Sequence, residues 1–224
     1  MIQTDIETVL EAFKSKTGRD ERFTKFDYCY NYFRRTDNPE RDLEKDCLML
    51  GFYLASWGMF RSSNFLLQKS AWHFIPTIDY ISSLDRSVWE IDVDNYTDGN
   101  IQQIENIYHD IKGRLVTHGR THKTLVTKVL LGVFGFVPAF DDYFTTTFRE
   151  IAGERCRFRS VNGNSLSLIK DFYEANRTSI DRWSKETFTT EFLSGEKTTT
   201  NYPKAKIIDM YGFQRGWERS QLKR

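Results

Sequence analysis

The chain has 224 residues, of which 39% are hydrophobic and 15% aromatic, and its formal net charge is +1. So many large apolar side chains exclude a disordered chain, because their burial offsets the conformational entropy lost on ordering. Only 4 prolines and 13 glycines are present, fewer than the turns of a β-sandwich need, and this scarcity favours long helices.

Hydrophobic periodicity predicts a series of helices with short connections, because apolar residues recur at intervals of three and four. The predicted helices lie near residues 2–13, 23–33, 43–57, 63–67, 101–115, 124–136, 142–148, 164–176, 178–188 and 203–215, with short helices within 73–93. The helix over 43–57 is apolar on its other faces too, so we expect it to be buried nearly all round. Residues 194–201 are predicted to form a polar loop.

These elements predict an all-α fold, a compact multi-helix single domain over residues 1–224. A division into two sub-lobes, 1–47 with 140–224 and 48–139, is compatible with the same pattern. No window approaches the roughly 18 apolar residues of a membrane span. The amphipathic N-terminus carries acids, unlike a signal or transit peptide. We therefore expect a cytoplasmic protein without a membrane partner, of unknown oligomeric state.

The three cysteines, Cys29, Cys47 and Cys156, are far apart and odd in number. They form no CxxC or Cys/His spacing, which argues against a disulfide framework, a zinc site and an iron–sulfur cluster. We expect buried, reduced thiols, no metal site and no cofactor.

Charge is distributed unevenly along the chain. Residues 1–110 carry 12 Lys and Arg against 19 Asp and Glu, a net −7, while residues 111–224 carry 20 against 12, a net +8. No acid occurs between Asp110 and Asp141. A local basic field is what a phosphate-binding surface requires. The alternative is that the two oppositely charged halves face each other across an internal interface.

The stretch from His122 to Asp141 combines a polar turn, an apolar helix that opens with Lys123, a Gly/Pro corner and an Asp at the start of the next helix. A lysine beside apolar walls is partly desolvated, which lowers its pKa and favours a nucleophilic amine. A helix N-terminus keeps an aspartate ionised. So tight a corner can bring both helix heads toward one cleft.

This stretch resembles the core of the helix-hairpin-helix DNA glycosylases of the endonuclease III type. The resemblance rests on Gly119, Lys123-Thr124, Phe134-Gly135 and Phe140-Asp141, and on the separation of 18 residues between Lys123 and Asp141. It implies a helical fold that binds double-stranded DNA and receives an extruded modified base. It also implies that Asp141 is catalytic and that, in a member with lyase activity, Lys123 forms the Schiff base.

The hairpin departs from the family pattern, because it has one glycine, no proline and three residues between Gly119 and Lys123. Lys128 is therefore a competing lysine, and Asp142 competes with Asp141. Purely structural roles stay open for both residues: Lys123 can be a solvated helix residue, and Asp141 can be a simple N-cap. The candidate DNA-binding residues are Lys112, Arg114, Gly119, Arg120, His122, Lys128, Arg155, Arg157, Arg159 and Trp57.

Trp57 continues the apolar stripe of the 43–57 helix, so a core position is the first expectation, and base stacking is the second. Trp57, Met59 and Phe60 are the candidates for a residue inserted into the DNA stack. Two other functions remain compatible with the sequence. One is a non-catalytic nucleic-acid-binding or phage-defence module on the same scaffold, and the other is a helical protein-interaction domain.

Overall fold

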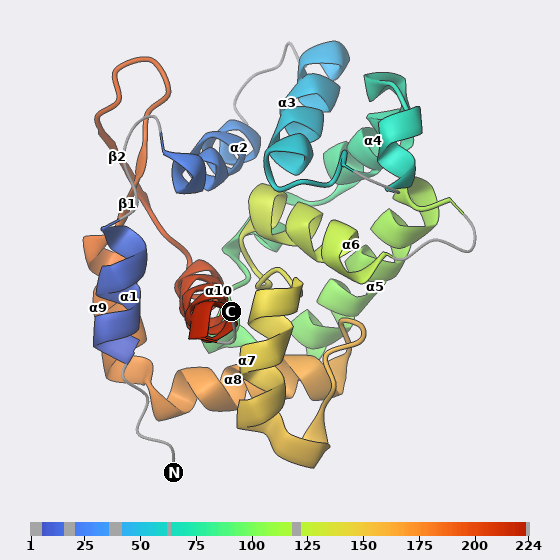
Figure 1. Ribbon diagram of the computed structural model, residues 1–224. Coiled ribbons are helices and arrows are strands. Elements are labelled where there is room, and N and C mark those ends of the chain that lie inside the picture. Colours follow the sequence, from blue (N-terminus) through green and yellow to red (C-terminus); the bar gives the residue numbers. More distant parts are fainter. Residues whose placement is uncertain (1–5, 16–20, 36–41, 62–63, 118–121, 223–224) are drawn as a thin grey trace.

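The computed structural model describes residues 6–15, 21–35, 42–61, 64–117 and 122–222 (Figure 1). Within these ranges the chain is mostly helical, which confirms the all-α class. The longer helices are α1 (Ile6–Lys14), α2 (Lys25–Arg34), α3 (Leu43–Ser56), α4 (Ile75–Ser83), α5 (Asp98–Leu115), α6 (Lys123–Val129), α7 (Asp142–Ala152), α8 (Gly163–Ala175), α9 (Arg177–Glu186) and α10 (Lys204–Leu222).

Short helical turns and one small hairpin connect these helices. The 3₁₀ turns are η1 (Arg22–Thr24), η2 (Phe65–Gln68), η3 (Ala71–Phe74), η4 (Arg86–Glu90), η5 (Val93–Asn95) and η7 (Gly153–Arg155), and η6 (Leu130–Phe134) is a π-helix. Strands β1 (Phe188–Thr190) and β2 (Lys197–Asn201) pair antiparallel. None of the helices in the described ranges combines the length and apolar character that a membrane span needs.

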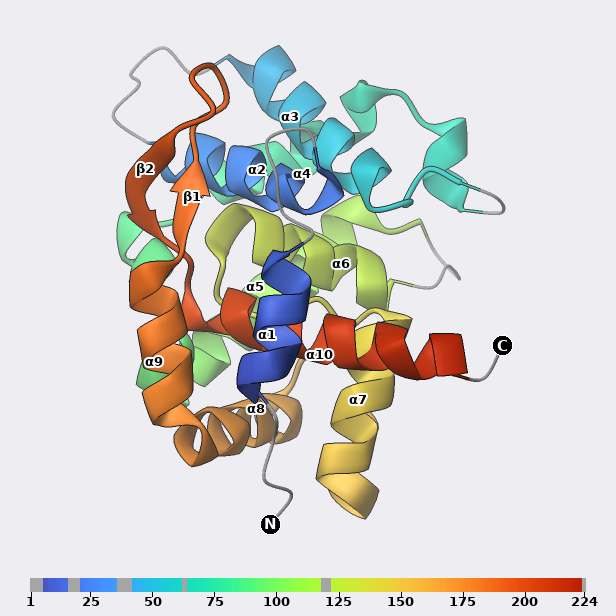
Figure 2. The same cartoon turned by 60° about the vertical axis from the view of Figure 1, so that its left-hand side comes forward.

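Helix α10 lies in the middle of the molecule, between α1, α7 and α9 (Figures 1 and 2). Its residues from Ala205 to Gln214 are all buried. Two glycines let α7 approach closely: a Cβ at Gly216 would lie 2.2 Å from the carbonyl oxygen of Tyr143, and one at Gly212 would lie 2.5 Å from the Phe144 ring. The close contact of α7 with α10 therefore depends on residues without side chains.

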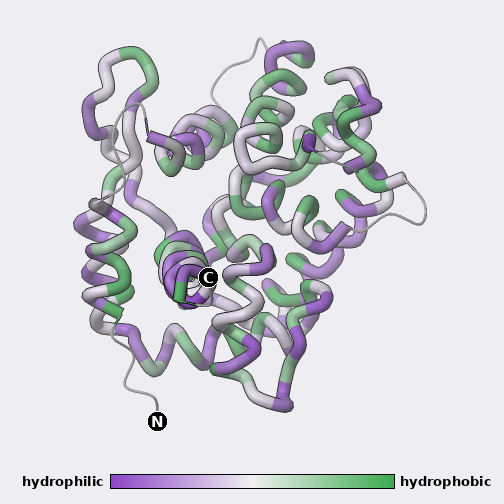
Figure 3. Tube along the Cα trace, viewed as in Figure 1, coloured by the Kyte–Doolittle hydropathy of each residue, from purple (hydrophilic) through white to green (hydrophobic). Residues whose placement is uncertain are grey.

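Phenylalanine rings fill the space along α7. The rings of Phe140 and Phe144 stack at 5.5 Å, those of Phe144 and Phe148 stack at 4.3 Å, and Phe158 meets all three edge-on. The buried residues from α1 to α10 form one continuous core. Hydrophobic and hydrophilic residues alternate along the outer helices, as expected for helices that cover a core (Figure 3).

The chain turns sharply between α6 and α7. The sequence predicts one helix over 124–136, but its last turn widens into the π-helix η6, and Gly135 ends it with a left-handed φ of 79°. A Cβ there would lie 2.7 Å from both Pro203 and Tyr30, so a glycine is required on steric grounds as well. Residues 135–140, which we call the corner, are all buried.

The predicted burial of the 43–57 helix is wrong on one face. Leu48 and Phe52 of α3 are 53% and 64% exposed, while Cys47, Leu50 and Leu54 are buried. Apolar residues on all faces suggested full burial, but only the face toward the core has neighbours to pack against. The three cysteines are buried and free.

The predicted loop over 194–201 contains strand β2, which pairs with β1 and is held to it by hydrogen bonds of Thr189 with the hydroxyl of Thr198 and the carbonyl oxygen of Thr200. Asp27 of α2 anchors the hairpin: it accepts the backbone N–H of Thr190 at 2.9 Å and the hydroxyl of Tyr202. Burial raises the pKa of Asp27 from 3.8 to about 6. Its contribution to stability is therefore present below about pH 4 and is lost as the pH rises through about 6.

The last helix continues to Leu222, beyond the predicted end at 215. Beyond Gly216 its residues are half-buried or exposed, and Arg219 pairs with Glu150 of α7. The apolar periodicity ends before the helix does, so the sequence pattern marks the buried part of α10 and not its full length.

We expect Gly216→Ala to lower the free energy of unfolding by roughly 3 kcal/mol, because the new methyl group meets the α7 backbone. The matched control is Gly113→Ala within α5, where a Cβ meets nothing within 4 Å. That variant should gain roughly 0.5–1 kcal/mol from better helix propensity. Urea unfolding followed by circular dichroism measures both. Equal effects of the two substitutions would contradict the close contact.

Candidate functional site at the heads of helices α6 and α7

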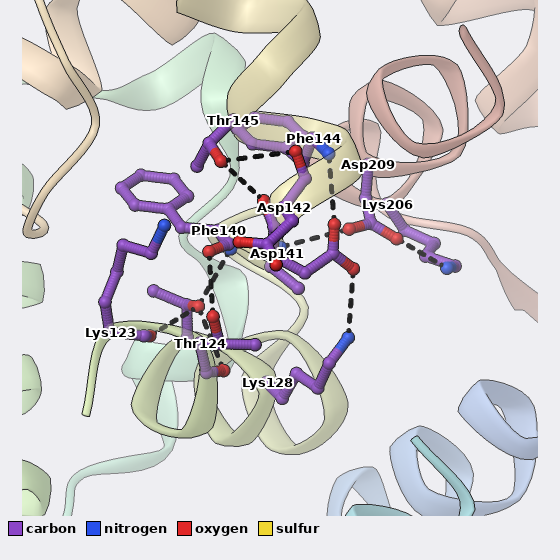
Figure 4. A network of polar contacts seen from close by, with 12 residues as sticks. Lys123, Thr124, Lys128, Phe140, Asp141, Asp142, Phe144, Thr145, Lys206 and Asp209 are labelled. Carbon is purple, nitrogen blue, oxygen red and sulfur yellow. Dashed lines mark hydrogen bonds and ion pairs between the residues drawn. The ribbon is translucent and has the colours of Figure 1, made fainter. Parts of the chain in front are cut away.

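The first turn of α6 lies against the end of the corner. The Thr124 hydroxyl donates to the carbonyl oxygen of Phe140 at 3.1 Å, and the backbone N–H of Phe140 donates to Thr127 Oγ1 at 2.8 Å. The Thr127 hydroxyl in turn donates to the carbonyl oxygen of Lys123 at 2.8 Å. The two helix heads are therefore held side by side, as the tight corner predicts (Figure 4).

Asp141 caps α7 and binds a buried lysine. Its Oδ1 accepts the backbone N–H of Phe144 at 3.0 Å, and its Oδ2 lies 3.2 Å from the ammonium of Lys128. The Asp141 side chain is only 15% exposed, whereas Asp142, the first residue of α7, is exposed. Of the two candidate carboxylates, Asp141 thus holds the cap and the ion pair, and Asp142 faces solvent.

Lys128 lies in a buried aromatic cluster. Its ammonium is 4.6 Å from the centre of the Trp57 ring, and its side chain is 5% exposed. Trp57 itself is 7% exposed and packs edge-on or tilted against Phe213 and Phe23. The structure therefore places Trp57 in the core, its first expected position, and keeps Lys128 away from the surface.

A second buried ion pair on α10 supports the corner. Lys206 and Asp209 lie 2.8 Å apart, and their side chains are 1% and 9% exposed. Asp209 Oδ1 also accepts the backbone N–H of Ala139 at 3.0 Å. This pair was not among the residues predicted from the sequence. Its signal is a Lys and an Asp spaced i,i+3 inside the apolar run Ala205–Phe213.

Lys123 lies on the other side of the corner from Lys128. Figure 4 shows its side chain beside the Phe140 ring, while the Asp141 carboxylate points toward Lys128. The pKa of Lys123 lies below that of an ordinary lysine, mainly because of partial burial and also because of the nearby Arg149 guanidinium. Asp142 and Asp141 act in the opposite direction. The structure records no ion pair of Lys123 with any residue that it describes.

Arg149 connects two basic segments that are separate in sequence. It projects from the exposed side of α7, acts electrostatically on Lys123 and donates from Nε to the carbonyl oxygen of Arg157 at 2.9 Å. Arg155, Arg157 and Arg159 are exposed, whereas the intervening Cys156 and Phe158 are buried. Exposed and buried residues thus alternate along this segment, and its arginines face outward.

Two of these arginines are held by neighbouring acids. Arg157 pairs with Glu154 at 3.1 Å, and Arg155 lies 3.6 Å from Asp171. Both are exposed pairs, which contribute little stability and can exchange a carboxylate for another anion at small cost.

The remaining basic candidates lie at the junction of α5 and α6. Lys112 is half-buried, and Arg114 is exposed, pairs with Asp110 at 2.6 Å and stacks 4.4 Å from the centre of the Tyr80 ring. His122 is half-buried beside Tyr108. The candidates Gly119 and Arg120 lie outside the described residues.

A hollow of about 990 Å³ lies elsewhere, between α2, α3 and the hairpin. Tyr32, Lys45, Arg86 and Phe192 are among its lining residues, and none of the candidate residues lines it. In the described ranges, no three His, Cys, Asp or Glu side chains gather as a metal site would require.

Comparison with protein-family models, with curated proteins and with solved structures finds no match to this chain. The likeness to helix-hairpin-helix glycosylases therefore stays a prediction from the residues quoted above.

We expect Lys128→Met to lower the free energy of unfolding by about 3 kcal/mol, because it leaves the Asp141 carboxylate without its buried partner. Arg157→Met is the control, since its pair with Glu154 is exposed and should contribute less than about 0.5 kcal/mol. Thermal and urea unfolding measure both variants. A Lys128→Met protein as stable as the control would show that the pair does not hold the two helices together.

Proposed function

We propose that the protein binds double-stranded DNA through one basic surface, the α5–α7 basic face. This face is made of Lys112, Arg114, His122, Lys123, Arg149, Arg155, Arg157 and Arg159. The observation that carries the proposal is the position of Arg149, which joins the basic end of α6 to the basic segment 155–159. Lysine and arginine side chains that neutralise phosphates release counterions, and this release drives DNA binding.

Of these eight side chains, Arg114, Arg155 and Arg157 pair with acids in the described part of the chain, and an exposed pair of this kind can exchange its carboxylate for a phosphate. No acid occurs in the sequence between Asp110 and Asp141, and Lys123 has no ion pair with a described residue. The arginines of segment 155–159 stand on a rigid support, since Phe158 is 1% exposed and packs on the Phe144 and Phe148 rings of α7. Such a surface suits a polyanion that extends over several phosphates better than a single small anion.

The direct test is the salt dependence of binding to a fluorescently labelled duplex of about 20 base pairs. We expect the logarithm of the binding constant to fall linearly with the logarithm of salt concentration. Arg149→Gln and Arg157→Gln should each reduce the magnitude of that slope by about 0.9, the value of one phosphate contact.

Lys197→Gln is the matched control, because Lys197 is exposed on β2, away from the basic face. It should leave the slope unchanged. No binding at low salt would overturn the proposal and leave a protein-interaction role, for which the exposed Leu48 and Phe52 of α3 offer a surface.

A second candidate function is base excision with a lyase step, and the lowered pKa of Lys123 favours it. In that reaction the Lys123 amine attacks C1′ of the sugar and loses a proton. The bond from C1′ to the base breaks, and the base leaves with the bonding electron pair and takes up a proton. Asp141 would stabilise the positive charge that develops on the sugar. The Asp141 carboxylate already binds the Phe144 N–H and the Lys128 ammonium, and this favours DNA binding without catalysis over base excision.

Borohydride trapping on duplexes that carry modified bases tests this second function. A cross-link should form with the wild type and with Lys197→Ala, whose lysine lies on β2 outside the basic face, and it should be lost in Lys123→Ala. Because the pKa of Lys123 is lowered, the neutral amine is populated at lower pH than in an ordinary lysine, so the trapping yield should level off at a lower pH. Equal trapping by Lys123→Ala would remove this lysine as the nucleophile.

Asp141→Asn must be interpreted together with a stability measurement. Asparagine keeps an oxygen that can accept the Phe144 N–H, but it removes the charge that faces Lys128. A loss of activity at unchanged stability would support catalysis, whereas a parallel loss of both would reflect unfolding.

A further inference from the structure

An exposed tryptophan lies next to the C-terminal end of α5. Trp72 in the 3₁₀ turn η3 is 78% exposed. Of the five tryptophans, Trp57, Trp89 and Trp183 are at most 8% exposed, and Trp217 is half-buried. Trp72 is therefore the one tryptophan that is largely exposed to solvent.

The turn that carries Trp72 is firmly mounted on the helical core. The next residue, His73, donates from Nε2 to the carbonyl oxygen of Leu115, the last residue of α5, at 2.8 Å. Phe74 is 1% exposed and packs on α3, where a Cβ at Gly51 would lie 3.1 Å from its ring. Trp72 is thus followed directly by two anchored residues in the same turn and does not project from a long loop.

This place adjoins the α5–α7 basic face. In Figure 1 the segment that leads into α4 lies beside the end of α5, as the His73–Leu115 hydrogen bond requires. Arg114, one residue before Leu115, stacks on Tyr80 of α4 at 4.4 Å. Lys69, three residues before Trp72, is exposed as well. Trp72 is thus an exposed aromatic ring in a segment that carries Lys69 and that is hydrogen-bonded to the end of α5, next to Arg114. An exposed aromatic ring combined with cations can receive an unstacked nucleobase while phosphates are neutralised nearby.

We propose that Trp72 stacks on a nucleobase that has left the duplex stack, so that the preferred ligand of the basic face is DNA with an unpaired or extruded base. This inference rests on the proposed DNA binding and adds its substrate class. Trp57, for which base stacking was the second expectation after a core position, is 7% exposed and does not fill this role. A fully paired duplex would contact the basic residues and leave the Trp72 ring in water.

Trp72 supplies its own reporter, because an exposed indole dominates the response of tryptophan fluorescence to a ligand that stacks on it. The protein would be titrated with two duplexes of one sequence, one fully paired and one with a single bulged base. We expect the bulged duplex to quench the emission and to bind more tightly than the paired duplex. Trp72→Phe should abolish the quenching while largely keeping affinity, because phenylalanine still stacks.

Trp72→Ala should weaken binding of the bulged duplex about tenfold and leave binding of the paired duplex within about twofold. Phe192→Ala is the matched control, since Phe192 is a 64% exposed aromatic residue on the distant hairpin, and both affinities should stay unchanged. Circular dichroism checks that each variant is folded, which the exposure of both rings leads us to expect.

Salt-dependent binding of both duplexes without a change in Trp72 emission, or equal affinity of wild type and Trp72→Ala for the bulged duplex, would overturn this inference alone. Absence of binding to either duplex at low salt would overturn it together with the proposed function.

Discussion

The fixed geometry of the corner between α6 and α7 determines the rest of this structure. Three segments far apart in sequence satisfy its buried backbone: Tyr96 binds the carbonyl oxygen of Phe136, Asp209 accepts the N–H of Ala139, and Thr127 accepts the N–H of Phe140. A buried backbone group without such a partner costs a large part of a hydrogen bond's free energy. The corner is therefore stable only when Tyr96, which follows η5, and helices α6 and α10 are all in place, and it then sets where α7 begins.

The two buried ion pairs next to the corner illustrate a compromise between solvation and specificity. Lys128 and Lys206 lie 4.6 Å and 5.8 Å from the centre of the same Trp57 ring, on which both ammonium groups find a favourable electrostatic surface. Desolvation of such charges offsets much of their mutual attraction, so the pairs add little net stability. Their effect is to permit one arrangement of α6, α7 and α10, since any shift leaves a charge buried without its partner.

Hydrophobic periodicity was sufficient to predict the helices, and the tight corner was sufficient to predict that the N-terminal ends of α6 and α7 lie close together. Both predictions rest on residues that are close together in the chain. Trp57 was also expected in the core. The orientation of the Asp141 carboxylate could not be derived in this way, since it depends on Lys128 being buried one helix away. Arg149 was missed for a related reason: one arginine on an amphipathic helix becomes informative only when Arg157 and Lys123 are seen beside it. The exposed face of α3 and the hairpin likewise depend on which neighbours are present.

The central place of α10 has a consequence for how the chain is made. This helix contacts α1, α7, α9 and η5, and it follows all of them in the sequence. A ribosome therefore releases every other element described here before the segment that fills the middle of the core. Until then, apolar residues of α1 and α7 lack the surface against which they pack. We infer that α1 and α7 cannot complete their packing until α10 has left the ribosome, and that their apolar residues are open to aggregation until then.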